Sequence, residues 1–205
     1  AWFKADSFSG LSDDGRIISK SNSSAEDDHY WMLSTVEVTD GIKYTRLRAR
    51  LKTGVETDTL IATSGNLEIN KWYHGVLLYN GTALKLYLNG QNVGSMLRTG
   101  LVSVNDNIPV TIGINPNGLH EWYGLIDEVA IWNKSLTDQE IFDLYYLSAQ
   151  KYYWKGEVND QTSSVESKTY QFDLGFSYNF PKVNINIPVD KSIINTTNVI
   201  INATV

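Results

Sequence analysis

The sequence predicts an all-β protein: an antiparallel β-sandwich with one short helix, followed by part of a second β-sandwich module. Three observations predict this class. Most apolar residues fall in short runs rich in β-branched and aromatic side chains, which favour strands. The pairs Asp40-Gly41, Asn80-Gly81 and Asn89-Gly90 separate such runs and suit tight hairpin turns. The 205 residues also include 18 Asn and 15 Gly, which readily adopt left-handed turn conformations.

The expected strands are short and closely spaced as far as Trp132. Each is bounded by turn residues, and regular spacing of many antiparallel strands is typical of a sandwich or jelly roll. They lie at Ile17–Ile18, Tyr30–Val38, Ile42–Leu51, Thr59–Ala62, Trp72–Tyr79, Ala83–Leu88, Val110–Ile114 and Gly124–Trp132.

The segment from Trp72 to Val93 predicts a three-strand meander, because its apolar runs are joined by Asn-Gly turns. Side chains alternate between the two faces of a strand. One face of the central strand therefore carries Lys85 and Tyr87, and the other carries Leu84, Leu86 and Leu88.

One helix is expected near the end of the sandwich. The sequence Thr137-Asp-Gln-Glu140 is a capping box, in which each side chain can bond the other residue's backbone N–H. Apolar residues follow at helical spacing, at Ile141, Leu144 and Tyr145. The helix covers only about three turns, so we expect it to pack on the sandwich.

The pattern changes after Gln150. We expect strands at Tyr152–Val158 and Lys168–Leu174 around a turn at Asn159–Ser164, and alternating apolar residues reappear at Val183–Ile187 and Val199–Val205. We therefore predict a β-hairpin and linker over 149–182 and the start of another β-module over 183–205. Because one strand pair is not stable alone, the chain is expected to be a piece of a longer protein.

Charge and composition exclude several classes of function. Lys and Arg number 17 against 23 Asp and Glu, which gives a formal net charge of −6 and disfavours binding to duplex nucleic acid. The absence of cysteine excludes disulfides, thiolate metal sites and cysteine nucleophiles. No apolar run approaches the roughly 20 residues that span a bilayer, so no membrane insertion is expected in this segment.

Several short motifs occur in one order with sensible gaps: Ala1-Trp-Phe-Lys4, Arg16-Ile-Ile-Ser-Lys20, Trp72-Tyr-His-Gly-Val76, Leu86-Tyr-Leu-Asn-Gly90, Ile112-Gly113, Gly124-Leu-Ile-Asp-Glu-Val-Ala-Ile-Trp-Asn133, Leu136-Thr137, Glu140-Ile141 and Leu144-Tyr145. In these motifs the chain resembles the laminin-G-like, concanavalin-A-like jelly-roll family. The resemblance implies such a domain over 1–148, with a further strand expected ahead of Ala1. The tail is similar to fibronectin- or immunoglobulin-like modules of microbial surface proteins.

Glucanases occur on the same fold, and retaining glycosidases need two carboxylates about 5–5.5 Å apart. Asp127-Glu128 is the best candidate pair, but adjacent strand residues point to opposite faces. Their same-face neighbours are not acidic. The three histidines, His29, His74 and His120, show no metal-binding spacing. We therefore predict that the domain is not an enzyme.

These patterns require no cofactor, but whether the domain binds calcium stays an open question. The resemblance implies it, because many laminin-G-like domains bind Ca²⁺ through loop carboxylates and carbonyls. No Asp-x-Asp-x-Asp-Gly loop is present. The candidate acids are Asp13-Asp14, Glu26-Asp27-Asp28, Asp106 and Asp127.

Two groups of residues are candidate ligand sites. Sugar rings stack on aromatic faces, and Trp122, Tyr123, His120 and Asn117 form the most suggestive cluster, together with Asn115 and Glu121. The alternative is that Trp122 belongs to the core, as the aromatic at this place often does in the family. The second group, Arg46, Arg48 and Arg50, shares one strand face. It could meet acidic or sulfated glycans, but we favour a solvated face paired with acids such as Glu37.

Five Asn-x-Ser/Thr triplets predict glycosylation at one or more sites in a eukaryotic or archaeal host. They begin at Asn22, Asn80, Asn133, Asn195 and Asn202.

The function expected from the resemblance is a non-catalytic extracellular adhesion or glycan-binding module of a larger cell-surface protein. Its partners would be surface glycans or neighbouring subunits. The alternative is a structural building block of a surface filament or layer. Such a homo-oligomer would assemble by β-strand contacts at the open edges near Ala1 and Val205, with no ligand of its own.

Overall fold

The computed structural model describes residues 1–8, 14–23 and 25–148, and beyond them four short strands at 152–154, 157–159, 164–166 and 170–172. The chain divides into two compact units, Ala1–Tyr145 and Tyr146–Val205. Within the described residues, no helix has the length and apolar character needed to cross a membrane.

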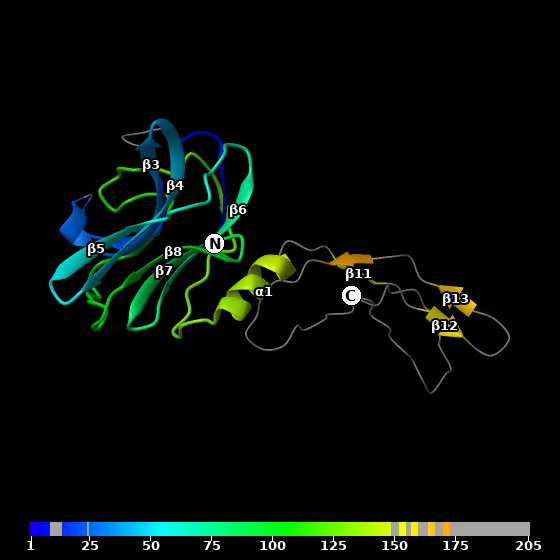
Figure 1. Cartoon of the computed structure of the whole chain (residues 1–205). Helices are drawn as coiled ribbons and strands as arrows, with labels where there is room; N and C mark the ends of the chain where they lie inside the picture. Colours follow the sequence, from blue (N-terminus) through cyan, green and yellow to red (C-terminus); the bar gives the residue numbers. More distant parts are fainter. Residues whose placement is uncertain are drawn as a thin grey trace. The chain divides into compact units, whose positions relative to one another are not determined.

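The first unit is a sandwich of two five-stranded antiparallel sheets, which confirms the predicted fold class (Figure 1). The first sheet has the order β10-β1-β6-β7-β8, with β1 Trp2–Ala5, β6 Trp72–Tyr79, β7 Ala83–Leu88, β8 Gln91–Leu97 and β10 Gly124–Asp127. The second has the order β5-β4-β3-β2-β9, with β2 Arg16–Ser21, β3 His29–Asp40, β4 Ile42–Thr53, β5 Glu56–Ile61 and β9 Val110–Ile112. A single turn of 3-10 helix, η2, covers Glu26–Asp28.

The second unit contains two antiparallel strand pairs: β11 (Tyr152–Trp154) with β14 (Tyr170–Phe172), and β12 (Glu157–Asn159) with β13 (Ser164–Glu166). The expected strands at Val183–Ile187 and Val199–Val205 lie outside the described residues. The domain limits at 148 and 182 stay predictions.

The predicted meander and its face assignment are confirmed. Strands β6, β7 and β8 follow one another as antiparallel neighbours. On β7, Leu84, Leu86 and Leu88 are buried between the two sheets, whereas Tyr87 lies on the opposite face. The inner faces of both sheets build one core from Phe3, Ile17, Ile18, Leu33, Leu47, Ala49, Leu51, Leu60, Ala62, Leu67, Tyr73, Leu84, Leu86, Leu88 and Val93.

Helix α1 (Asp138–Ser148) packs on the outer face of the first sheet. Its Ile141 is fully buried against Val76, Leu78 and Tyr87. The capping box forms as predicted: the Glu140 N–H donates to the Thr137 hydroxyl at 3.1 Å, and the Thr137 N–H donates to the Glu140 carboxylate at 2.7 Å. The cap sets the start of the helix and the apolar face holds it on the sheet.

Some strand ends differ from the prediction. The strand expected to run to Trp132 ends at Asp127, because Glu128 adopts a left-handed conformation with φ of 47° and donates its N–H to the Asp127 carboxylate. Strand β9 stops at Ile112, before Gly113 at φ 75°. At β5 the start lies earlier than expected, at Glu56, because cross-strand pairing with β4 extends it.

Candidate functional site: a buried arginine cluster on the second sheet

Polar side chains gather on the outer face of the second sheet, away from the core. The alternation of β4 sends Leu47, Ala49 and Leu51 inward, so the arginines between them face outward. Cross-strand pairing sets Arg16 of β2 opposite Ser34 of β3, and Ser34 opposite Arg48 of β4. A row of polar side chains therefore crosses three strands, in residues that are far apart in the sequence.

Contrary to the expectation of a solvated face, most of this cluster is buried. Arg16 is fully buried, Arg48 is 6% exposed and His29 is fully buried. The chain after β9 folds back along β2: the Gly113 N–H donates to the Ile17 carbonyl and the Arg16 N–H donates to the His120 carbonyl. The Asn115 side chain of this segment contacts Arg16, whose side chain is 0% exposed.

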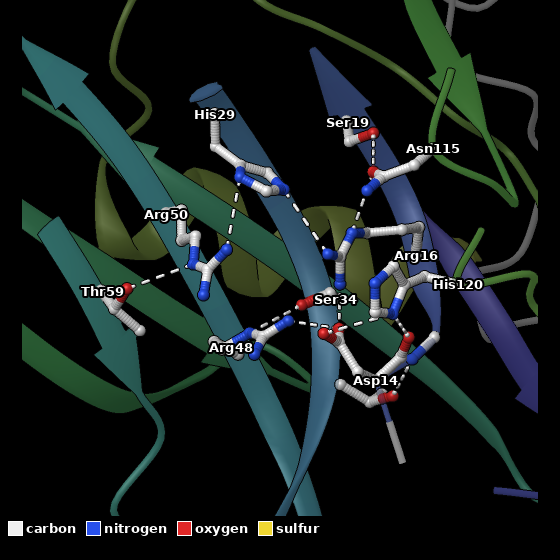
Figure 2. Close-up of polar contacts among 12 residues, drawn as sticks. Asp14, Arg16, Ser19, His29, Ser34, Arg48, Arg50, Thr59, Asn115 and His120 are labelled. Carbon is white, nitrogen blue, oxygen red and sulfur yellow. Dashed lines mark hydrogen bonds and ion pairs between the residues drawn. The ribbon is translucent and has the colours of Figure 1, made fainter. Parts of the chain in front are cut away.

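Asp14 provides the negative charge at one end of the cluster. One of its carboxylate oxygens pairs with the guanidinium groups of both Arg16 and Arg48. His120 approaches the other oxygen through Nδ1 at 3.4 Å. Figure 2 shows these side chains turned toward one another across β3. Glu37, the expected partner of the arginine face, instead pairs with Lys43, so that part of the prediction is wrong.

Asn115 organises the far side of Arg16 (Figure 2). Its Oδ1 accepts hydrogen bonds from the Arg16 Nε at 3.0 Å, the Ser19 hydroxyl at 3.1 Å and the Ser21 hydroxyl at 3.3 Å. The side chain is only 1% exposed. A buried amide oxygen with three donors rigidly positions the loop that carries it.

The hydrogen bonds of His29 fix its tautomer. Its Nδ1 lies 2.7 Å from the Ala25 carbonyl, and its Nε2 lies 3.4 Å from the Arg16 Nη2. A carbonyl can only accept and a guanidinium can only donate, so Nδ1 carries the proton and Nε2 accepts. Burial, and then the charges of Arg16 and Arg50, lower the pKa of His29 to about 4, which keeps the ring neutral.

This tautomer leaves Arg50 short of acceptors. Its Nη1 lies 3.2 Å from the same His29 Nδ1, but a protonated Nδ1 cannot accept that bond. The Arg50 Nε donates to the Thr59 hydroxyl at 3.2 Å, and the described residues provide no other acceptor for this guanidinium. Arg50 is half-buried, so it is the arginine of the cluster that solvent reaches.

Three carboxylates, those of Asp14, Glu26 and Asp27, act on the three arginines of the cluster. Burial and the charges of Arg48 and Arg50 lower the pKa of Arg16 to about 9. Burial likewise lowers the pKa of Arg48 to about 10, against the opposing charge of Glu26. Glu26 and Asp27, on the 3-10 turn η2, are the opposing charges that act on Arg50.

The structure separates the predicted aromatic ligand cluster. His120 joins the arginines, whereas the Asn117 side chain accepts the Leu119 N–H of its own turn at 3.3 Å. Trp122 packs edge-on against Phe3 in the core, in line with the alternative reading. Tyr123 is 48% exposed, and its hydroxyl donates to the Glu121 carboxylate at 3.5 Å.

Sequence reasoning missed Arg16 and His29 as partners of the arginine face, and it named Asp14 and Asn115 for other roles. An arginine beginning an apolar strand at Arg16-Ile-Ile was the one available signal. His29 and His120 both border the cluster, whereas His74 lies elsewhere, stacked on Tyr145 and tilted against Trp2.

Neither a metal centre nor a carboxylate pair stands out. Among the residues that the structure describes, no three histidine, aspartate or glutamate side chains form a group that could hold a metal ion. Asp127 and Glu128 are both exposed, and the first is bonded to the backbone of the second.

A hollow of about 380 Å³ lies between the two sheets next to Ala1. Its lining is mostly apolar: Trp31, Leu33, Leu51 and Leu77 contribute to it, together with the segment 129–136. Convergent polar groups of the kind that orient a ligand are found instead at the arginine cluster.

Comparison with known proteins agrees with this architecture. Residues 1–142 match the family model Laminin_G_3, described as the concanavalin A-like lectin/glucanases superfamily. The adhesion G-protein coupled receptor V1 of Danio rerio is 25% identical over 136 residues, which are 64% of this chain and 2% of that protein. Usherin of Mus musculus is 26% identical over 114 residues, which are 53% of this chain and 2% of usherin.

The chain thus spans a small fraction of the length of these relatives. Among solved structures, a pentraxin of Limulus polyphemus is similar in fold, with a TM-score of 0.54, 16% identity and coverage of 83% of this chain and 79% of the pentraxin. From the family match over more than half of its residues, the chain belongs to the laminin-G-like family of the concanavalin A-like superfamily.

Proposed function

We propose that this domain is a non-catalytic, extracellular adhesion module of a larger cell-surface protein and that it binds glycans. The observation that carries the proposal is the arginine cluster, an organised polar site on the outer face of a laminin-G-like sandwich. Its guanidinium, amide and hydroxyl groups are hydrogen-bonding groups of the kind that recognise sugars. An adhesion receptor and usherin among the relatives support this kind of role.

The test is binding of the complete 205-residue chain to a glycan array, together with adhesion of cells to surfaces coated with it. We expect a restricted set of glycans to bind and cell adhesion to be competed by the same glycans in solution. Absence of binding in both assays, with a folded protein, contradicts the proposal. A reducing-sugar assay that detects glycan cleavage contradicts its non-catalytic part.

A structural role in a surface filament or layer is the second candidate. The expected open edge near Ala1 is wrong, because β1 pairs with both β10 and β6. The candidate is favoured instead by β9, which among the described strands pairs only with β2 and exposes Val110 and Ile112 by 42% and 54%. An edge strand of this kind can take up a strand from another chain. Light scattering that finds a monomer at high protein concentration counts against this candidate. Self-association of the protein that is abolished by the substitution Val110→Lys would support it.

Calcium binding is a separate proposal, suggested by the family rather than by a ligand set. Asp14 is paired with arginines and Asp13 lies outside the described residues, which leaves Glu26, Asp27, Asp28, Asp106 and Asp127 as the acids to examine. Titration of chelator-treated protein with Ca²⁺ should release heat and raise the melting temperature. If millimolar Ca²⁺ produces neither heat nor a rise in the melting temperature, calcium binding is ruled out.

Glycosylation is proposed most specifically at Asn80, which is exposed on the β6–β7 hairpin. Its Oδ1 accepts three hydrogen bonds from Thr82 and Ala83, so the loop geometry does not depend on the amide nitrogen that a glycan would modify. Asn22 and Asn133 are also exposed, whereas Asn195 and Asn202 lie outside the described residues. An intact mass equal to that of the bare chain, measured on native material, refutes this.

A further inference from the structure

We infer that Asn80 is a site of spontaneous deamidation, and that the folded β6–β7 hairpin promotes the reaction. The product carries an aspartate or an isoaspartate at position 80. This inference goes beyond the proposed function, because it concerns a chemical change in the protein itself and requires no ligand.

The reaction takes place between Asn80 and the residue that follows it. A bond forms between the Gly81 backbone nitrogen and the Asn80 Cγ, the bond from Cγ to Nδ2 breaks, and ammonia leaves with the proton of the Gly81 N–H. Water then opens the resulting succinimide ring at either carbonyl, which gives aspartate or isoaspartate. The net reaction consumes water and releases ammonia, so it needs no enzyme, metal or oxidant. Asparagine is a thermolabile residue in proteins.

The first argument is the accessibility of the attacking nitrogen. Gly81 has no side chain to obstruct the approach, and no atom lies within 4 Å of the place where a Cβ would stand. In the part of the chain that the structure describes, no acceptor contacts the Gly81 N–H. Asn80, Gly81 and Thr82 are all exposed, so water and base reach the site.

The second argument is the set of donors around the Asn80 Oδ1. This oxygen accepts hydrogen bonds from the Ala83 N–H at 2.8 Å, the Thr82 hydroxyl at 2.9 Å and the Thr82 N–H at 3.0 Å. Negative charge develops on the same oxygen when Gly81 attacks and the amide carbon becomes tetrahedral. Fixed donors about 2.7–3.1 Å from such an oxygen stabilise the transition state, as in an oxyanion hole.

Two other Asn-Gly pairs in the sequence, at Asn89 and Asn117, are matched controls. At Asn117 the side-chain oxygen accepts the Leu119 N–H, at the longer distance of 3.3 Å. The attacking nitrogen of that pair, in Gly118, already donates to the Asn115 carbonyl at 2.9 Å. This pair therefore has a weaker set of donors and a less available nitrogen.

Asn89 is protected in a different way. Its Oδ1 accepts the His74 N–H at 2.9 Å, and the residue itself is only partly exposed. The following Gly90 is buried, with Phe142 and Tyr145 of α1 lying against it. Water and base reach this pair less easily than the pair at Asn80.

The two products differ in their effect on the hairpin. An aspartate retains an oxygen that can accept the same hydrogen bonds as the Asn80 Oδ1. An isoaspartate adds a methylene to the main chain directly after Tyr79, whose pairing with Leu84 ends the β6–β7 ladder. A glycan on Asn80 would be attached to the nitrogen that must leave, so it would oppose deamidation.

The experiment is peptide mapping by mass spectrometry of the complete, unglycosylated chain during incubation at neutral pH. We expect the mass change from NH₂ to OH to appear at Asn80 at least about tenfold faster than at Asn89 and Asn117. In concentrated urea the turn is lost and the three pairs become alike, so this difference should disappear. The rate at Asn80 should rise with pH, because the attacking nitrogen must lose its proton.

Two variants test the role of the donors. Thr82→Val removes the hydroxyl and should slow the reaction at Asn80 about threefold, whereas Thr82→Ser should keep the original rate. The rates at Asn89 and Asn117 in each variant show whether the fold is retained. The inference is overturned if Asn80 reacts no faster than the other two pairs in the folded chain, if urea accelerates its reaction, or if Thr82→Val leaves the rate unchanged.

Discussion

Asp14 should be one of the costliest polar residues to remove from this domain. In Asp14→Asn the guanidinium groups of Arg16 and Arg48 lose their shared carboxylate, although their side chains are 0% and 8% exposed. Removing one partner of a buried ion pair costs roughly 3–5 kcal/mol. The amide oxygen of the asparagine can still accept hydrogen bonds from the arginines, so we expect a loss near the lower end, about 3 kcal/mol. That is a large share of the roughly 5–15 kcal/mol that stabilises a domain.

The assay is urea denaturation followed by tryptophan fluorescence, with the free energy of unfolding taken from linear extrapolation. Glu37→Gln is the control, because it breaks an ion pair to Lys43, whose side chain is 71% exposed, and should cost less than about 1 kcal/mol. Arg48→Met in the Asp14→Asn background should restore part of the loss, since it removes a buried charge. The reasoning is refuted if Asp14→Asn and Glu37→Gln have equal effects.

Three further outcomes are expected. The melting temperature should fall as pH drops from 6.5 toward 4.5. The pKa values of His29 and His74 in the folded protein, about 4 and 3, lie below those in the unfolded chain, so the unfolded chain takes up protons first and is favoured. A melting temperature that does not change over this pH range would contradict this. Gly124→Ala should cost more than about 3 kcal/mol, since a Cβ there overlaps backbone of β1, whereas Gly81→Ala, with open space, should cost only about 1 kcal/mol. Thr137→Ala should cost about 1 kcal/mol in urea denaturation, because it removes the cap of α1, and no loss would mean that packing alone sets the helix.

Local rules of sequence predicted much of the fold. The Asn-Gly turns, the alternation on β7 and the capping box at Thr137 each depend on residues within a few positions of one another, so their geometry is set by short-range sterics and hydrogen bonding. The strand end at Asp127 was missed because a non-glycine residue, Glu128, adopts a left-handed conformation there, which no propensity rule foresees.

The candidate site was predictable only in part. The alternation of Arg46, Arg48 and Arg50 placed them on one face of β4, which the structure confirms. Their burial and their partners were not predictable, because Asp14 and the 113–120 segment reach them through the pairing of β2 with β3 and β9.

The sequence by itself determined the class of this protein, its hairpins, its helix and the face that each strand presents to the core. Only the tertiary structure decided that Arg48, in a row of arginines expected to be solvated, is buried with Arg16 against Asp14. The physical reason lies in the separation of its parts: Arg16 and Asn115 are 99 positions apart and Arg48 and Asp14 are 34 apart. Such contacts depend on the order of the strands and on which loop covers the sheet. The alternation of apolar and polar residues along a single strand contains no information on either.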